Sequence, residues 1–181
     1  MSDTFQILTK RLVDGKVVEE KIITDVLIKE VKSIKDLGFN HKEQIDIVTS
    51  CQDSLLEAQS NSLFEEIEAC PKCQGKLKFA GKVQSLFHSV FSDHKIPVKR
   101  RKCCNKECGW TSVPSINSLF GTSSHPDLSK LQTETAANST YRSSQKILNA
   151  MSYYERKVNN HKHLHRIIES VGNYISDLTP L

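Results

Sequence analysis

The sequence predicts an α+β fold: an N-terminal β-hairpin and long helix, a central zinc ribbon, and a C-terminal three-helix unit resembling a helix-turn-helix. Three observations support this. An Asp-Gly turn separates two apolar runs near the N-terminus, two cysteine groups flank a basic stretch, and three helical periodicities follow a late His-Pro-Asp turn. We therefore expect three domains, residues 1–69, 70–121 and 122–181.

The first domain is predicted to be a hairpin followed by a helix. Residues 4–13 and 17–28 are rich in β-formers, and the Asp-Gly pair at 14–15 is a favoured hairpin turn. An Asn-x-x-Glu capping box at 40–43 begins a helical apolar pattern that continues to about residue 68. Because a long solitary helix needs a partner surface, we expect it to pack on the hairpin or, alternatively, to form the seam of a homodimer.

Five of the six cysteines form two close groups that together offer one tetrahedral metal site. Four thiolates are what structural zinc requires, and a site closed by four of them does no chemistry. Cys70, Cys73 and Cys108 are the first three expected ligands. Adjacent strand residues point to opposite faces, so only one of Cys103 and Cys104 should reach the metal. We favour Cys103, because its longer spacing to Cys108 leaves room for the intervening turn.

Composition limits the class of protein. The chain has 181 residues and 38% hydrophobic content, with no apolar run of membrane-spanning length and no basic, apolar signal at the start. We therefore expect a cytoplasmic protein without a membrane partner, in which reduced cysteines hold zinc rather than form disulfides. His88 or His94 in place of one cysteine is the alternative ligand set.

Charge is distributed unevenly along the chain. Residues 1–69 hold 8 Lys and Arg against 14 Asp and Glu, whereas residues 70–121 hold 10 against 2. A basic block around a metal site is a candidate surface for a polyanion such as double-stranded DNA. The expected phosphate contacts are Lys99, Arg100, Arg101 and Lys102.

The predicted last helix, residues 160–174, starts with a polar and basic cluster. In a helix-turn-helix the second helix enters the major groove by its N-terminal end, and Asn, Lys and Arg are side chains that contact bases and phosphates. A solvated helix face is the competing interpretation. The expected DNA contacts are Asn160, His161, Lys162 and Arg166.

The sequence shows no catalytic constellation. Acidic residues beyond Cys70 are scattered, and neither a phosphate-binding Walker motif nor a Gly-x-Ser-x-Gly motif is present. We therefore expect a chain that is not an enzyme and takes no small-molecule substrate.

The order of these motifs resembles a known family. The sequence is similar to the N-terminal part of ISKra-type bacterial insertion-sequence transposases. The segments that carry the similarity are, in order, CPKC, a basic stretch, CCNKECGW, VPSINSLFGTSSHPDL, YRSSQKILN and NNHKHLHRIIESVG. The resemblance covers roughly residues 65–176. It implies a bacterial, nucleoid-associated DNA-binding region that recognises element ends. The family's DDE catalytic domain, which has an RNase H-like fold and uses magnesium, lies downstream of this region and is not part of this chain.

These observations together predict zinc-stabilised DNA binding in the context of transposition. The alternative function is a zinc-stabilised protein-interaction module, for instance a regulator that dimerises through the first helix.

Overall fold

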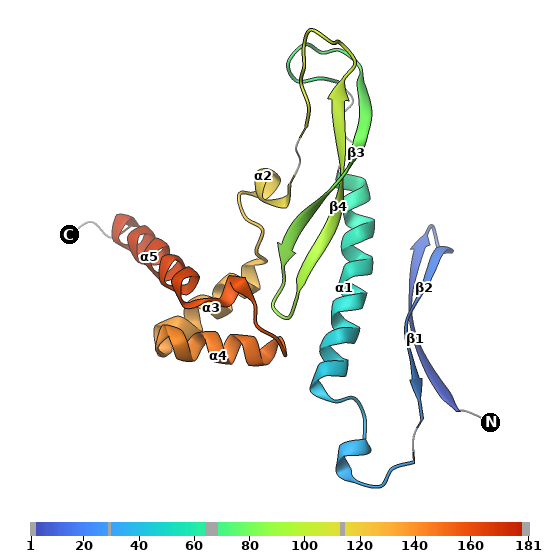
Figure 1. Cartoon of the computed structure of the whole chain (residues 1–181), viewed down its shortest axis with the longest axis vertical. Coiled ribbons are helices and arrows are strands. Elements are labelled where there is room, and N and C mark those ends of the chain that lie inside the picture. Colours follow the sequence, from blue (N-terminus) through green and yellow to red (C-terminus); the bar gives the residue numbers. More distant parts are fainter. Residues whose placement is uncertain (1–2, 29, 64–68, 113–114, 179–181) are drawn as a thin grey trace. The chain divides into compact units, whose positions relative to one another are not determined.

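The computed structural model describes residues 3–28, 30–63, 69–112 and 115–178 and confirms the α+β class. Within these residues the chain forms two antiparallel β-hairpins, five α-helices and two short 3-10 helices (Figure 1). Contacts divide the chain into two compact units, unit 1 (Met1–Ala58) and unit 2 (Gln59–Leu181). The cysteine hairpin and the C-terminal helices therefore belong to the same unit.

Unit 1 contains the first hairpin and most of the long helix. Strands β1 (Thr4–Val13) and β2 (Lys16–Leu27) pair antiparallel around Asp14 and Gly15. Both turn residues have positive φ, at 50° and 75°, as expected for an Asp-Gly turn of type I′. Helix α1 (His41–Leu63) begins at the predicted capping box, and its predicted end at 64–68 lies outside the described residues.

The second hairpin organises unit 2. Strand β3 (Leu77–His88) pairs antiparallel with β4 (Asp93–Cys103), with one register shift between Phe79 and Lys82. From sequence alone, the β-formers at 76–80 and 83–90 predict two short strands. Gly81, with φ of 97°, instead forms a bulge inside one continuous strand.

Alternation along these strands gives the hairpin two faces. The face that we call the covered face carries Ser85, Ile96 and Val98, all buried. The backbone N–H of Ile116, which begins the short helix α2 (Ile116–Phe120), donates to Ser85 Oγ at 2.8 Å. The opposite face, which we call the open face, consists of Phe79, Lys82, Gln84 and Leu86 of β3 and Lys95, Pro97, Lys99 and Arg101 of β4.

Three helices complete unit 2. Helices α3 (Pro126–Asn138), α4 (Tyr141–Met151) and α5 (His161–Leu178) pack on one another around Ala136, Leu148 and Leu164. Residues 152–160 connect α4 to α5, a longer connection than the three or four residues of a typical helix-turn-helix turn.

The bundle differs from the sequence prediction in one core position. From sequence alone, the apolar spacing over residues 141–153 predicts that Ile147, Leu148 and Met151 face inward. Leu148 is buried, but Ile147 is 49% exposed. The interior of a bundle this small accepts a narrower apolar stripe than the sequence offers.

Candidate metal centre and basic surfaces

Four cysteine thiols meet at one end of the β3–β4 hairpin. The Sγ atoms of Cys70, Cys73, Cys103 and Cys108, here called the thiol cluster, lie within 4.8 Å of one another. The Cys70–Cys108 and Cys73–Cys103 Sγ distances are 3.7 and 3.4 Å. A zinc ion with Zn–S bonds of 2.3 Å would space tetrahedral sulfurs by about 3.8 Å. The cluster therefore has the dimensions of a site that can hold a metal ion.

Two tight backbone turns bring the thiols together. The carbonyl of Cys70 accepts a hydrogen bond from the N–H of Gln74, and the Cys70 N–H donates to the carbonyl of Gly75. On the other strand, the N–H of Cys103 donates to the carbonyl of Trp110 at 2.9 Å. Because the last pair of the β-ladder joins Leu77 to Cys103, the hairpin register itself aligns the two turns.

Each thiol of the cluster also accepts a hydrogen bond from a backbone N–H two residues further along the chain. The four donors are Lys72, Gly75, Asn105 and Trp110. Backbone N–H groups aimed at sulfur stabilise thiolates, the form of cysteine that binds metal. The donor set and its surroundings thus fit a metal site closed by four thiolates.

Gly75 lies directly beside the cluster. A Cβ atom at Gly75 would lie 3.3 Å from Cys73 Sγ and 3.6 Å from Cys103 Sγ. The first distance is shorter than a usual Cβ contact, so an alanine here would require Cys73 Sγ to shift by a few tenths of an ångström, whereas the second is an ordinary van der Waals contact.

The thiols differ in acidity. Burial raises the pKa of Cys70, but the N–H groups of Lys72 and Cys73 outweigh burial and lower the pKa to about 7. Burial raises the pKa of Cys103. Cys70 is therefore the thiol that ionises first near neutral pH, and a cation entering the cluster would displace protons from the others.

The structure separates the alternative ligands from the cluster. Cys104 is exposed and is not a member, because it follows Cys103 directly and takes the opposite side of the chain. His88 and His94 lie at the far end of the hairpin. His88 is hydrogen-bonded to Asp93 at 2.7 Å, and His94 Nε2 lies 2.9 Å from the Oγ of Ser89.

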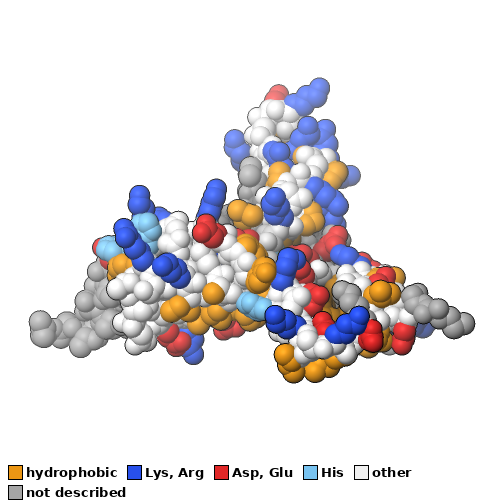
Figure 2. Space-filling view, turned by 60° about the horizontal axis from the view of Figure 1, so that its bottom comes forward, with side chains coloured by type: hydrophobic (Ala, Val, Ile, Leu, Met, Phe, Trp, Pro, Cys, Tyr) orange, Lys and Arg blue, Asp and Glu red, His pale blue; other side chains and the backbone are white. Residues whose placement is uncertain are grey.

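The basic run at 99–102 does not form a single surface. Lys99 and Arg101 lie on the open face, whereas Arg100 and Lys102 take the register positions of the covered face. Figure 2 shows Lys and Arg side chains crowding the cysteine end of the hairpin, uppermost in that view. The four predicted phosphate contacts are thus basic and near the cluster, but they point in two directions.

The first turns of α5 do present one basic face. His161, Lys162, His165 and Arg166 are all exposed, and their spacing places them on one side of the helix. Asn160 has a different place: its Oδ1 accepts the backbone N–H of His163 at 2.9 Å and caps the helix. The structure therefore groups three of the four predicted residues and gives Asn160 a capping bond.

A buried arginine joins the hairpin to the helices, and sequence reasoning missed it. Arg156 precedes the short 3-10 helix before α5, and its side chain has no exposed area. It donates to the carbonyls of Ser89, Val90 and Ser92 at 2.8 to 2.9 Å and to Asp93 Oδ1 at 2.6 Å. We call this set the Arg156 clamp. Its partners are more than sixty residues away in sequence, so no local pattern indicates it.

The clamp also fixes the charge of Asp93. Burial raises the pKa of this carboxyl, but hydrogen bonds from His88 and Arg156 outweigh burial and hold the pKa below its usual value. Asp93 therefore remains ionised and is committed to a structural bond.

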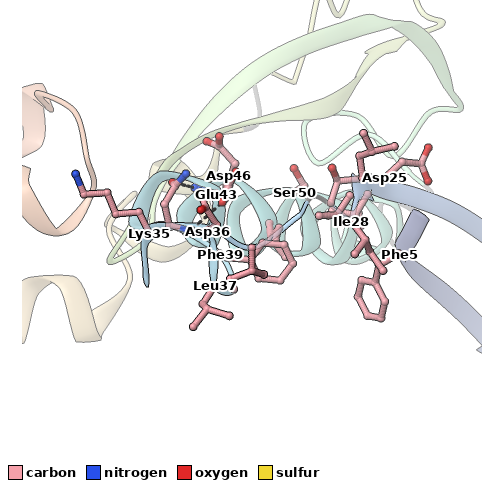
Figure 3. A pocket seen from close by; sticks show the side chains of 18 residues that line it. Phe5, Asp25, Ile28, Lys35, Asp36, Leu37, Phe39, Glu43, Asp46 and Ser50 are labelled. Carbon is pink, nitrogen blue, oxygen red and sulfur yellow. Dashed lines mark hydrogen bonds between the residues drawn. The ribbon is translucent and has the colours of Figure 1, made fainter. Parts of the chain in front are cut away.

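Unit 1 contains a pocket of about 840 Å³ (Figure 3). Apolar groups such as Phe5, Ile28 and Phe39 line it together with several carboxylates. These acids serve local structure: Asp36 accepts the N–H of Ser33, Glu43 accepts that of Asn40, and Asp25 accepts from Gln6. We assign no reaction to this pocket.

Comparisons with known proteins identify no relative: no protein-family model matches the chain, and no curated protein matches it. Among the described residues, no helix has the length and apolar character needed to cross a membrane.

Proposed function

We propose that this chain is a zinc-stabilised DNA-binding protein, equivalent to the N-terminal part of an ISKra-type transposase. The observation that carries the proposal is the thiol cluster, which closes the end of a strongly basic hairpin. The motif order from residue 65 to 176 supports the narrower assignment to a transposase.

Zinc is the metal that this donor set favours. Four thiolates in tetrahedral spacing are typical of structural zinc, and such a site contributes directly to folding. The test is metal content, measured by mass spectrometry on purified protein. We expect one zinc per chain, retained in Cys104→Ser and lost or strongly weakened in Cys103→Ser. Equal zinc loss in the two variants would contradict the proposed ligand set.

DNA binding is supported by two basic surfaces in unit 2. One is the hairpin, with residues 70–121 carrying 10 Lys and Arg against 2 acidic residues. The other is the exposed face of α5 that contains Lys162 and Arg166. The Arg156 clamp ties the hairpin turn to the segment before α5, so the elements that carry the two surfaces are directly bonded to each other.

The experiment is duplex binding by the zinc-loaded chain, measured by fluorescence anisotropy over a range of salt concentrations. Affinity should fall steeply with salt, because each phosphate contact releases counterions. The double variant Lys162→Glu with Arg166→Glu should weaken binding and reduce the salt slope by about two, roughly one per lost contact.

A matched control separates contact from net charge. Lys16→Glu with Lys21→Glu makes the same charge change on the exposed hairpin of unit 1, where we place no DNA contact. Affinity in this control should remain near that of the wild type. If both double variants weaken binding equally, the face of α5 is not a DNA surface. If the zinc-loaded wild type binds no duplex, the proposed function is wrong.

A second candidate function, self-association, is favoured by unit 1. Leu12 and Val17 are paired across the hairpin and are 56% and 52% exposed, and Ile22 on the same face is 54% exposed. Ile45, at 7% exposure, is the one buried apolar side chain among the described residues of this unit. A two-stranded hairpin is marginal alone, so a second copy covering this face would stabilise it. Light scattering should show a dimer that Val17→Lys with Ile22→Lys dissociates; a monomeric wild type would exclude this candidate.

A further inference from the structure

The open face of the β3–β4 hairpin combines charge with an exposed aromatic ring. All four of its β3 residues, Phe79, Lys82, Gln84 and Leu86, are exposed. The β4 positions of the same face contribute three further cations and a proline. The face therefore carries four basic side chains, and the carboxylate of Asp93 at its turn end is already bonded to His88 and Arg156.

Phe79 is the unusual member of this surface. Its side chain is 63% exposed, although a phenylalanine in a strand normally packs against a neighbouring layer. The ladder places Arg101 directly opposite Phe79, and the next pair on the same face is Lys82 with Lys99. The ring thus lies between cationic positions, beside a bulge at Gly81 that locally bends the strand.

This arrangement matches one class of ligand. Surfaces for single-stranded nucleic acid combine cations that follow the backbone with aromatic rings on which bases stack. Successive positions on one strand face are about 6.6 Å apart, so neighbouring cations can reach successive phosphates of an extended strand. A duplex would meet the cations but offers the ring no unpaired base, because its bases are already stacked.

We propose that the open face binds unpaired nucleotides, with Phe79 stacking on a base and Lys82 and Arg101 contacting the flanking phosphates. This inference rests on the proposed function in assuming a nucleic-acid partner. It adds a second substrate form, single-stranded DNA, and a surface separate from the face of α5.

The test compares two DNA forms on the zinc-loaded full chain. Anisotropy is measured with fluorescein-labelled oligo(dT) and with a labelled duplex. Phe79→Ala should weaken oligo(dT) binding between about fivefold and a hundredfold, as expected for loss of one stacking contact, and should change duplex binding less than twofold. Phe79→Trp should retain the oligo(dT) affinity.

Leu86→Ala is the matched control, because Leu86 is an apolar residue of the same face and strand that is 51% exposed. It should change oligo(dT) binding less than twofold. Ultraviolet cross-linking to oligo(dT) followed by mass spectrometry should place a thymine adduct on residue 79 in the wild type. Equal losses in Phe79→Ala and Leu86→Ala, or equal losses on both DNA forms, would overturn the proposal.

The two proposals fail in distinguishable ways. If the wild type binds duplex with steep salt dependence but does not bind oligo(dT) at low salt, only the present inference is wrong. If it binds neither form, the proposed function is wrong as well. If Lys162→Glu with Arg166→Glu removes duplex binding and leaves oligo(dT) binding intact, the two surfaces are separate, as proposed.

Discussion

Replacing Arg156 with alanine should strongly destabilise unit 2. The guanidinium makes four hydrogen bonds of 2.9 Å or less, three to hairpin-turn carbonyls and one to Asp93. Alanine leaves these acceptors without their donor in a site where the arginine side chain has no solvent contact.

The expected loss in free energy of unfolding follows from the burial of the clamp. Removing one partner of a buried ion pair costs about 3 to 5 kcal/mol, because the remaining charge and acceptors stay desolvated. Asp93 retains partial solvent access at 29% and a hydrogen bond from His88, so we expect about 3 to 4 kcal/mol. This is a large part of the 5 to 15 kcal/mol that stabilises a typical domain.

Denaturant unfolding of the zinc-loaded protein measures this cost. Trp110, the single tryptophan of the chain, reports on the cysteine end of the hairpin, and circular dichroism reports on the helices. In the wild type the two signals from unit 2 should change together, because the clamp couples hairpin and bundle. In Arg156→Ala both midpoints should fall, and the transitions should separate.

Two further variants test the explanation. Arg156→Lys keeps the charge but loses the planar fork, so it should recover less than half of the stability. Arg142→Ala removes an exposed arginine from the same helical unit and should change stability by no more than about 0.5 kcal/mol. If Arg156→Ala is no more destabilising than Arg142→Ala, the clamp does not stabilise this fold.

Three other predictions concern single positions. The carboxylate of Asp93 should stabilise the protein above about pH 4, and this stabilisation should disappear as the pH falls through the lowered pKa of Asp93. The difference in free energy of unfolding between the wild type and Asp93→Asn should therefore shrink between pH 5 and pH 2. Gln74 has a left-handed φ of 58°, so Gln74→Gly should raise the free energy of unfolding by about 0.5 to 1 kcal/mol. Gly109 has a φ of 62°, so Gly109→Ala should lower the free energy of unfolding by about 1 kcal/mol. A loss of stability in Gln74→Gly would contradict this account. Gly75→Ala should weaken zinc binding by up to about tenfold in competition with a chelator, because its Cβ crowds Cys73 Sγ; an unchanged affinity would show that Cys73 can shift without cost.

The features that sequence predicted well are local ones. The turn at 14–15 needs positive φ at both positions, which Asp and Gly tolerate, so two residues identify the first hairpin. The N-terminal ends of α1 and α3 follow from capping signals at Asn40 and Pro126. Alternation along a strand indicated that only one of Cys103 and Cys104 can face the cluster, and the longer spacing to Cys108 favoured Cys103, which the structure places in the cluster.

The features that sequence did not predict depend on distant partners. Nothing near Arg156 distinguishes it from a solvated arginine, since its acceptors are contributed by the turn at 89–92. The basic run at 99–102 suggested one surface, but its strand conformation divides it between two faces. Helix α2 was missed because it has five residues, although Ser115 and Gly121 supply caps at its ends.

The β3–β4 hairpin is held at both ends, and this gives the proposed zinc site a physical means of influencing the proposed DNA binding. A two-stranded hairpin alone is marginally stable. Here the thiol cluster closes one end of the hairpin and the Arg156 clamp fixes the other. The backbone that carries the basic side chains between them is therefore ordered before any ligand binds. Ordering those residues on binding would otherwise cost free energy at each immobilised side chain. Zinc removal should therefore weaken nucleic-acid binding although no basic side chain is a metal ligand, and Arg156→Ala should have the same effect from the opposite end.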